Sequence, residues 1–433
     1  MDKNLVVNPE LEGRGERPDG WVTWTPRPEL SQVFRFKTDD PKRLVISSSG
    51  DKRAFACWRG EVKFEPGKWH RASVRVRLRG VANPSLSVFA QAGRHFLTPK
   101  TAWGEETTLE VVFPYTNDAD GSAFDLYLRA CESGEVDWFE PRVEAIEKPR
   151  HRIARVAAVR FGDPVMPDAH RRAPAAEPLT LEMQRERITR KLAEAGALKP
   201  DIVCLPEASP IIGVPPEIYE SFTAQAEAVP DGPVCRVLSE GAKEHRMYVI
   251  AGVAERDGDY VFNTAALFGR DGEFIGRYRK THLTFYELEW GVSCGEDYPT
   301  FDLDFGRVAI HICNDEWFPE ISRLYAHKGV EVLFLPEWGG LPHTWRTRAV
   351  DNGVYFVASS ISQPSMVIDS SGAILAEVKG DGIACADLDL DCRRAYCYGE
   401  PNLSFGVPGM APHMRNTLDN TIIKDLARIM EEA

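Results

Sequence analysis

The spacing of apolar residues changes near residue 150, and this change limits the folds that the chain can adopt. Before that point, short segments such as 70–78 and 107–113 alternate apolar and polar residues, and turn-forming residues separate them. After it, continuous apolar runs such as 153–159 alternate with segments of helical period such as 181–197. Alternation with period two is typical of antiparallel sheets, whereas strands that alternate with helices indicate an α/β fold.

We therefore expect two domains in this chain of 433 residues. Residues 1–147 predict an all-β sandwich, and residues 153–433 predict an α/β domain whose C-terminal tail begins at about residue 391. Six of the ten tryptophans fall in the first domain. Large aromatic side chains can form the core of a small sandwich or stack on sugar rings, so both roles stay open.

The composition excludes several classes of partner. A net charge of −13 argues against a nucleic acid or an anionic membrane surface as partner. No apolar run approaches the ~20 residues of a membrane span. The nine cysteines stand singly along the chain, and the first residues lack the apolar core of a signal peptide. These features predict reduced thiols in a cytoplasmic protein.

Three apolar strands of the α/β part end on chemically reactive residues. Glu207 follows the run 201–205, Lys280 follows the run 274–278, and Cys313 follows the run 308–312. A tight turn at the end of a strand is where α/β folds present a nucleophile. A carboxylate, an ammonium and a thiol in such positions are the components of a cysteine-based amide hydrolase.

The chemistry assigns a role to each of these groups. The Cys313 thiolate would attack an amide carbonyl and form an acyl-enzyme, which divides one difficult step into two easier ones. Glu207 would act as general base, because a buried carboxylate can have a pKa near neutrality. Lys280 would stabilise the oxyanion, and the backbone N–H of Asn314 would supply a second donor.

A Cys–His dyad is an alternative arrangement. His282 and His311 both lie near the predicted site in sequence. His311 stands two residues before Cys313, so the two side chains would share one face if the strand continued through both. A buried core histidine is the competing interpretation.

The motifs form an ordered series that resembles the carbon–nitrogen hydrolase, or nitrilase, superfamily. The segments that carry the resemblance are 201–207, 263–283, 305–315, 348–357 and 367–375. The resemblance implies a four-layer α-β-β-α sandwich that assembles into a homodimer or a higher homo-oligomer. It also implies Glu207 as base, Lys280 as the catalytic lysine and Cys313 as nucleophile.

The resemblance implies three further site features. A second active-site glutamate normally follows the lysine, and here Glu287 and Glu289 are both candidates, with Glu287 favoured. The residue after the nucleophile is often aromatic in this family, whereas here it is Asn314. Residues 335–342 lie where the family places substrate contacts. There Glu337 would bind an amine or amide N–H, and Trp338 would form an apolar wall.

The first domain resembles the jelly-roll modules of carbohydrate-binding proteins at its edges, in residues 8–13, 18–21 and 136–143. A glycan is therefore one possible partner. A role in shaping the pocket entrance or an oligomer interface is the alternative.

Together these features predict an enzyme that hydrolyses a non-peptide C–N bond in a small-molecule amide or N-carbamoyl amide, through a thioester on Cys313. Nitrile hydrolysis is the less favoured reaction. The chemistry requires neither a metal nor an organic cofactor. Two alternatives stay open: an acyltransferase that uses the same triad, and a catalytically silent protein that binds a glycan or a partner. The sequence does not define which amide is the substrate.

Overall fold

The computed structural model divides, at Arg150 and His151, into two compact units. The described residues are 3–30, 33–48, 50–51, 53, 55–100, 103–115, 121–161, 180–211 and 222–391. The tail predicted from about residue 391 lies almost wholly outside them. None of the helices in these ranges is both long enough and apolar enough to cross a membrane.

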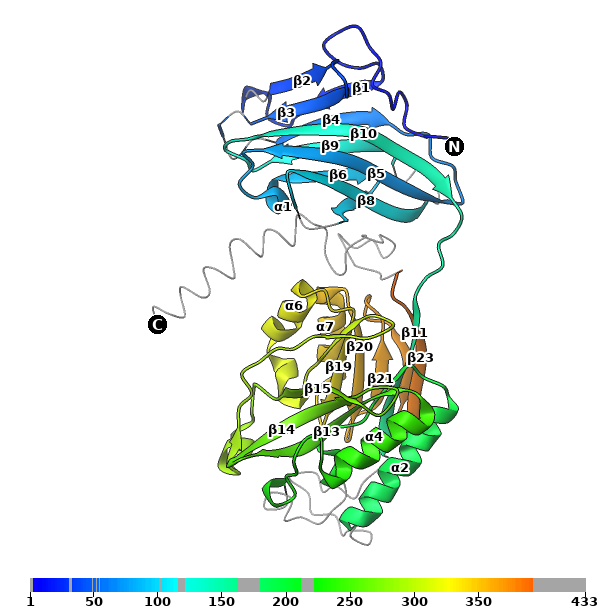
Figure 1. Ribbon diagram of the computed structural model, residues 1–433, viewed down its shortest axis with the longest axis vertical. Helices are drawn as coiled ribbons and strands as arrows, with labels where there is room; N and C mark the ends of the chain where they lie inside the picture. The colour runs from blue at the N-terminus through cyan, green and yellow to red at the C-terminus, as the bar shows by residue number, and fades with distance from the viewer. Residues whose placement is uncertain are drawn as a thin grey trace. The chain divides into compact units, whose positions relative to one another are not determined.

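The N-terminal unit is built from one antiparallel sheet of ten strands (Figure 1). The strands are β1 (Trp21–Trp24), β2 (Val33–Lys37), β3 (Arg43–Ser47), β4 (Phe55–Glu61), β5 (Lys68–Arg79), β6 (Val88–Ala92), β7 (His95–Pro99), β8 (Glu106–Tyr115), β9 (Ala123–Arg129) and β10 (Glu135–Ile146). Their order across the sheet is β1-β4-β9-β6-β7-β8-β5-β10-β3-β2.

This sheet folds over at β7, which pairs with β6 on one side and β8 on the other, so that its two halves enclose one core. Trp58 of β4 and Trp138 of β10 are buried in that core, and the indole N–H of Trp58 donates to the carbonyl of Val45 at 3.1 Å. Trp24 is 42% exposed. The jelly-roll connectivity and the likeness to carbohydrate-binding proteins stay predictions.

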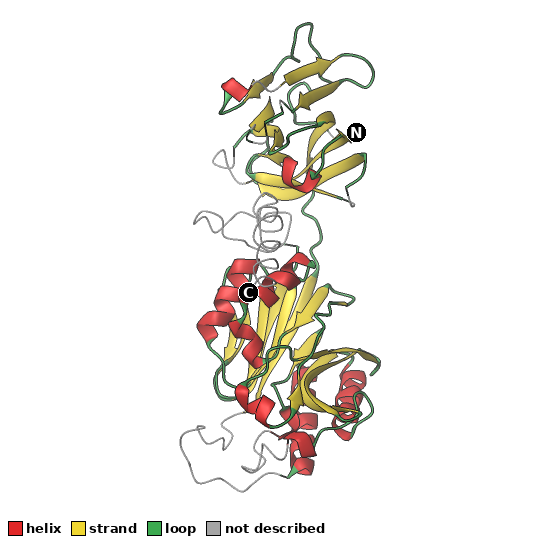
Figure 2. Ribbon diagram, turned by 90° about the vertical axis from the view of Figure 1, so that its left-hand side faces the viewer, coloured by secondary structure: helices red, strands yellow, loops and turns green. Residues whose placement is uncertain are grey.

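The second unit contains two mixed sheets (Figure 2). The first has the order β15-β14-β13-β12-β11-β23, with β16 paired to β14, and the second has the order β17-β18-β19-β20-β21-β22. The strands of the first sheet are β11 (Ile153–Phe161), β12 (Ile202–Cys204), β13 (Tyr248–Asp257), β14 (Tyr260–Phe268), β15 (Phe274–Arg279), β16 (Val292–Ser293) and β23 (Asp381–Asp389). Those of the second are β17 (Phe301–Asp302), β18 (Arg307–Ile310), β19 (Val332–Glu337), β20 (Tyr355–Ser360), β21 (Ser365–Ile368) and β22 (Ile374–Val378).

The two sheets of this unit pack on each other through an apolar core. Val156 and Ile202 of the first sheet share it with Ile310 and Phe334 of the second. The central strands are buried on both faces, which explains why they appear in the sequence as continuous apolar runs. Val159 of β11 points to the face of the sheet opposite Val156, where it packs with the helices that cover that face.

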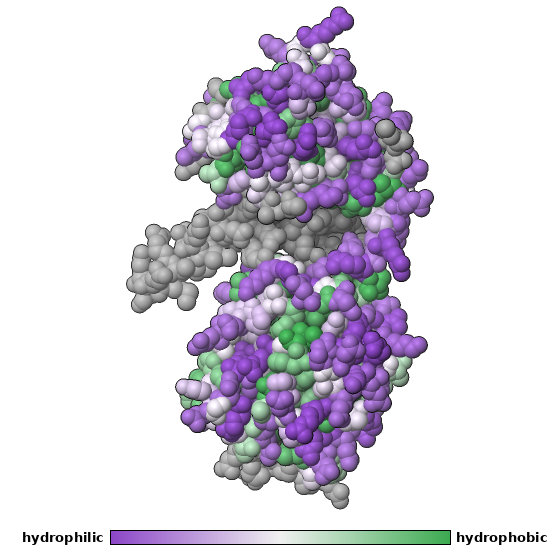
Figure 3. All heavy atoms as spheres, viewed as in Figure 1, coloured by the Kyte–Doolittle hydropathy of each residue, from purple (hydrophilic) through white to green (hydrophobic). Residues whose placement is uncertain are grey.

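Helices cover the outer face of each sheet. On the first sheet, α2 (Leu181–Ala197) and α4 (Pro233–His245) pack in one cluster with β11 and β13. On the second sheet, α6 (Pro319–His327) and α7 (Pro342–Asn352) pack in another cluster with β19 and β20. Hydrophilic residues dominate the face seen in Figure 3, which also shows an apolar patch on this unit.

Candidate active site

Four reactive side chains stand at or just beyond the ends of strands in the second unit. Glu207 follows β12, Lys280 follows β15 directly, Cys313 follows β18, and Glu337 is the last residue of β19. The carboxyl ends of β12, β18 and β19 therefore supply most of the site. Gly252 of β13 makes room for the first of these residues, since a Cβ on Gly252 would lie 2.6 Å from the Cα of Glu207.

The ammonium of Lys280 joins two carboxylates. Its Nζ lies 2.9 Å from Oε1 of Glu207, and 3.0 and 2.9 Å from the two oxygens of Glu287. The three side chains are buried, with exposed fractions of 5% for Glu207, 1% for Lys280 and 4% for Glu287. A buried charge network with this many short contacts is stable only as a whole, because loss of one member leaves the others unpaired.

Asn263 of β14 connects the same two carboxylates from another side. Its Nδ2 donates to Oε1 of Glu207 and to Oε1 of Glu287, both at 2.7 Å. The amide therefore fixes the positions of both oxygens without adding charge. Sequence reasoning did not single out Asn263, because a buried polar residue inside a strand has no distinguishing local pattern.

The structure separates the two candidate glutamates after the lysine. Both lie on the short helix α5 (Phe285–Glu289), but Glu287 is buried against Lys280 and Glu289 is exposed. Thr284 explains the difference, because it forms a capping box with Glu287: each side chain bonds to the backbone N–H of the other residue. One Glu287 oxygen thus holds the helix start while the carboxylate contacts Lys280.

Cys313 adopts a backbone conformation that most residues avoid. Its φ is 43°, in the left-handed region, and it begins the 3-10 helix η4 (Cys313–Trp317). Asp315 holds this turn, since its Oδ2 accepts the backbone N–H of Ile312 at 2.9 Å and the hydroxyl of Tyr278 at 2.8 Å. Oδ1 of the same carboxylate accepts the backbone N–H of His282 at 3.0 Å. Asp315 therefore fastens the nucleophile turn to the segment that carries the lysine.

Two of the residues predicted to bind substrate, Asn314 and Trp338, have structural contacts of their own. The Asn314 side chain donates to the backbone carbonyl of His282 at 3.2 Å, so it serves the local structure. Its backbone belongs to the first turn of η4, where N–H groups lack partners within the helix. Trp338 is partly buried. It packs against the apolar cluster between the first sheet and its helices, and against a second cluster that contains Ala208 and Ile211.

Glu337 is held by the loop that follows it. Its Oε1 accepts the backbone N–H groups of Trp338, Gly339 and Gly340, at 2.9, 2.8 and 2.8 Å. The side chain has no exposed surface. Its carboxylate acts electrostatically on the Cys313 thiol, which places it beside the nucleophile.

Strand alternation would have put His311 on the same face as Cys313, but the structure does not. Strand β18 ends at Ile310, and the positive φ of Cys313 breaks the alternation, so His311 faces Tyr325 and Phe356 on the helix-covered side. Neither of its ring nitrogens has a hydrogen-bond partner among the described residues. His282 stacks on Phe318, with ring centroids 3.9 Å apart.

The electrostatics of the site suit proton transfer. Burial raises the pKa of Glu207 to about 7, against the opposing effect of Lys280. Desolvation of the sulfur, reinforced by Glu207 and Glu337, raises the pKa of the Cys313 thiol well above its usual value. Burial alone would lower the pKa of Lys280, but Glu207, Cys313 and Glu287 outweigh it and raise that pKa, so the lysine stays charged.

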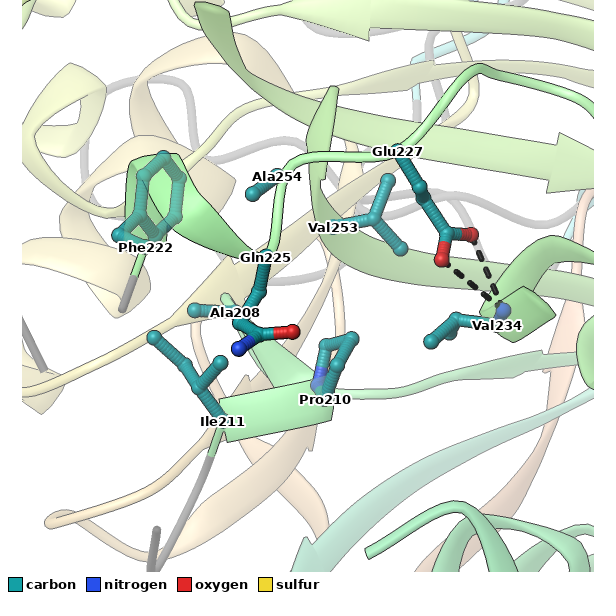
Figure 4. A pocket seen from close by; sticks show the side chains of 9 residues that line it. All are labelled: Ala208, Pro210, Ile211, Phe222, Gln225, Glu227, Val234, Val253 and Ala254. Atoms are coloured by element: carbon teal, nitrogen blue, oxygen red, sulfur yellow. Dashed lines mark hydrogen bonds between the residues drawn. The ribbon is translucent and has the colours of Figure 1, made fainter. Parts of the chain in front are cut away.

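A small apolar pocket lies beside Ala208, the residue after Glu207 (Figure 4). It is lined by Ala208, Pro210, Ile211, Phe222, Gln225, Glu227, Val234, Val253 and Ala254. The Glu227 carboxylate points to the backbone N–H of Val234 and caps α4 (Figure 4). None of Lys280, Glu287 and Cys313 lines this pocket, so we do not assign the chemistry to it.

Comparisons with known proteins give matches to most of the second unit. The family model described as carbon-nitrogen hydrolase matches residues 169–398, more than half of the chain. The protein named omega-amidase NIT2 of Homo sapiens is 34% identical over 209 residues, which cover 40% of this chain and 75% of that protein. A protein of Pyrococcus abyssi named nitrilase is 35% identical over 178 residues, which cover 40% of this chain and 66% of that protein.

One solved structure is that of Nit3 from Saccharomyces cerevisiae, described as a member of branch 10 of the nitrilase superfamily. It has 27% sequence identity and a TM-score of 0.47, and the alignment covers 55% of this chain and 90% of that one. The residues matched by the family model all follow His151, so the family model assigns nothing to the N-terminal unit.

Proposed function

Because the chain belongs to the carbon–nitrogen hydrolase family, we propose that it hydrolyses a small-molecule amide or N-carbamoyl amide through a thioester on Cys313. The observation that carries the proposal is the buried group of Glu207, Lys280 and Glu287 beside a cysteine in a left-handed turn. The packing of helices on the outer faces of two stacked sheets supports a four-layer α-β-β-α sandwich for this unit.

Acylation begins with proton transfer from Cys313. The high pKa of the thiol means that it needs a base, and Glu207, with a pKa of about 7, can accept the proton at neutral pH. As sulfur bonds to the carbonyl carbon, Lys280 and the backbone N–H of Asn314 stabilise the oxyanion. Glu207 then gives its proton to the leaving nitrogen, and the C–N bond breaks.

Deacylation uses the same groups in reverse. Glu207 takes a proton from water, the hydroxide attacks the thioester, and the thiol is regenerated with release of the acid. Glu287 keeps Lys280 in place through both steps. An acyltransferase would follow the same route with an amine or alcohol instead of water, so we retain it as the alternative. The intact buried charge network argues against a catalytically silent binding protein.

The proposal is tested with a panel of amides, N-carbamoyl amino acids, ureides and nitriles. We expect ammonia release from at least one amide or carbamoyl compound, together with an acyl adduct on Cys313 by intact mass. Added hydroxylamine should yield the hydroxamate if the acyl-enzyme also transfers to amines. Absence of both ammonia and adduct across the panel would contradict the proposal.

Activity should depend on the protonation of Glu207. Protonated Glu207 cannot accept the thiol proton, so the active form is the carboxylate, which predominates above a pKa of about 7. We expect kcat/KM for an uncharged amide to fall about tenfold per pH unit below that pKa. Initial rates at low substrate concentration, measured from about pH 5 to about pH 9, check this. A rate that stays constant down to the lower limit would exclude Glu207 as the base.

A further inference from the structure

One oxygen of the Glu337 carboxylate is buried without a hydrogen bond. Oε1 accepts three backbone N–H groups, whereas Oε2 has no hydrogen-bond partner among the described residues. The side chain is completely buried. A buried carboxylate oxygen without a donor is unfavourable, so its presence beside a nucleophile indicates a ligand group that completes it.

The reaction removes the proton of the thiol that interacts with the Glu337 carboxyl group. In the resting enzyme the Cys313 thiol interacts with the Glu337 carboxylate. During acylation the thiol proton passes through Glu207 to the leaving nitrogen, while the S–C bond forms and the C–N bond breaks. The thioester has no S–H, and the leaving group has departed. A donor for Oε2 at that stage comes from the acyl group of the substrate or from the water that enters for deacylation, and only a donor on the acyl group would stay in place through both steps.

The charges near the nucleophile favour a positive donor. Glu207 and Glu287 already share the ammonium of Lys280. Glu337 and its neighbour Glu316 are both fully buried, and neither forms an ion pair with a lysine or arginine in the part of the chain that the structure describes. Burial raises the pKa of Glu337, and burial together with Glu337 raises the pKa of Glu316 to about 8, so the protonated form of Glu316 predominates at neutral pH. A cation on the acyl group would stabilise the charged form of Glu337, whereas a carboxylate in its place would meet repulsion.

The loop after Glu337 is set in place before substrate binds. Glu316 accepts the backbone N–H of Leu341 at 3.0 Å and the indole N–H of Trp345. A Cβ on Gly340 would lie 2.6 Å from the Glu316 carboxylate, so a larger residue at this position would displace that carboxylate. Glu316 thus holds the loop of residues 338–341, and the backbone N–H groups of that loop hold Oε1 of Glu337. The position of Oε2 on the same carboxyl group is therefore defined as well.

We propose that the acyl group of the substrate carries a positively charged nitrogen that donates to Oε2 of Glu337. The inference rests on the proposed amide hydrolysis and specifies its substrate class: amides of small acids that bear an ammonium or guanidinium group. Charge-assisted hydrogen bonds are about twice as strong as neutral ones, which makes a cation the best match for a buried carboxylate oxygen.

Three amides of matched length test the proposal in the full-length protein: γ-aminobutyramide, pentanamide and glutaramate. They differ at the far end of the chain, which is cationic, neutral or anionic. We expect kcat/KM to be highest for γ-aminobutyramide, by about tenfold over pentanamide, and lowest for glutaramate. β-Alaninamide and butanamide repeat the comparison for a shorter chain.

The variant Glu337→Gln should remove this preference. The Gln carbonyl can still accept the three backbone N–H groups, so the loop is retained, but an NH₂ group replaces Oε2. We expect the ratio of kcat/KM for cationic over neutral amide to fall to about one. The matched control Glu320→Gln changes an exposed glutamate of α6 and should leave the ratio as in the wild type.

The outcomes separate this inference from the proposed function. If the amides are hydrolysed without preference for the cation, or if Glu337→Gln keeps the wild-type ratio, the substrate class is wrong while amide hydrolysis stands. If no amide is hydrolysed and no adduct forms on Cys313, the proposed function fails and the inference fails with it.

Discussion

Replacement of Cys313 by alanine should abolish amide hydrolysis and leave the fold intact. No other thiol replaces the nucleophile, so we expect kcat to fall by about 10⁴-fold or more. The change removes one sulfur atom from a partly buried side chain at the edge of the core between the sheets, so the free energy of unfolding should change by about 1 kcal/mol. Ammonia release and chemical denaturation measure the two effects.

The exposed Cys294 provides the matched control for this variant. Cys294→Ala should keep both turnover and the acyl adduct that intact mass detects, whereas Cys313→Ala should lose both. Turnover by Cys313→Ala near the wild-type rate would end the proposal of covalent catalysis. Loss of the native denaturation transition would instead assign Cys313 a structural role.

Lys280→Met should weaken both catalysis and stability. Loss of an oxyanion donor lowers kcat by about 10²–10³-fold. The methionine also leaves the buried carboxylates of Glu207 and Glu287 without their cation, and breaking a buried ion pair in this way costs about 3–5 kcal/mol. Denaturant unfolding and steady-state kinetics on the same preparation give the two values.

The stability loss should grow as pH rises. Lys280 lowers the pKa of Glu207, so its removal moves that pKa further above the value of about 7. A carboxyl with a raised folded-state pKa supplies stability at low pH that is lost as pH rises through that pKa. The difference in free energy of unfolding between the wild type and Lys280→Met should therefore grow as pH rises above about 7. A difference that does not depend on pH would contradict the proposed charge network. As a control, Lys243→Met replaces an exposed lysine of α4 and should have the same free energy of unfolding as the wild type at each pH.

Much of the second unit follows from local sequence pattern. The helix predicted for residues 181–197 has those bounds in the structure, because Thr180 caps its start and Pro200 follows its end. The segments that carry Glu207, Lys280 and Cys313 lie at strand ends, because apolar runs mark buried strands without any tertiary information.

Helix α4 was not predicted, although its buried residues Val234, Cys235, Leu238 and Ala242 have helical spacing. Gly241 stands among them and lowers helix propensity. The structure supplies the reason for that glycine, since a Cβ there would lie 2.5 Å from Leu192 of α2. The close packing of these two helices thus leaves little room for a side chain at position 241.

The supporting residues of the site depend on contacts between distant segments. Asn263, Asp315 and Glu316 act through partners that only the tertiary fold brings near, so their sequence neighbourhoods reveal little. Glu287 is different, because Thr284 three residues earlier forms the capping-box pattern. That pattern could have decided between Glu287 and Glu289 from sequence.

The first strand of the second unit, β11, starts beside the point where the last described strand, β23, ends. Ile153 at the start of β11 pairs with Asp389 at the end of β23, and His151 contacts the Asp389 carboxylate at 2.6 Å. Glu207 lies beyond the other end of these strands, since β12 runs parallel to β11. The nine residues of β11 span about 30 Å at roughly 3.3 Å each. The chain therefore enters this unit at the end of the sheet opposite Glu207, so a tether attached just before Ile153 would hold the unit by the end that lacks the reactive groups.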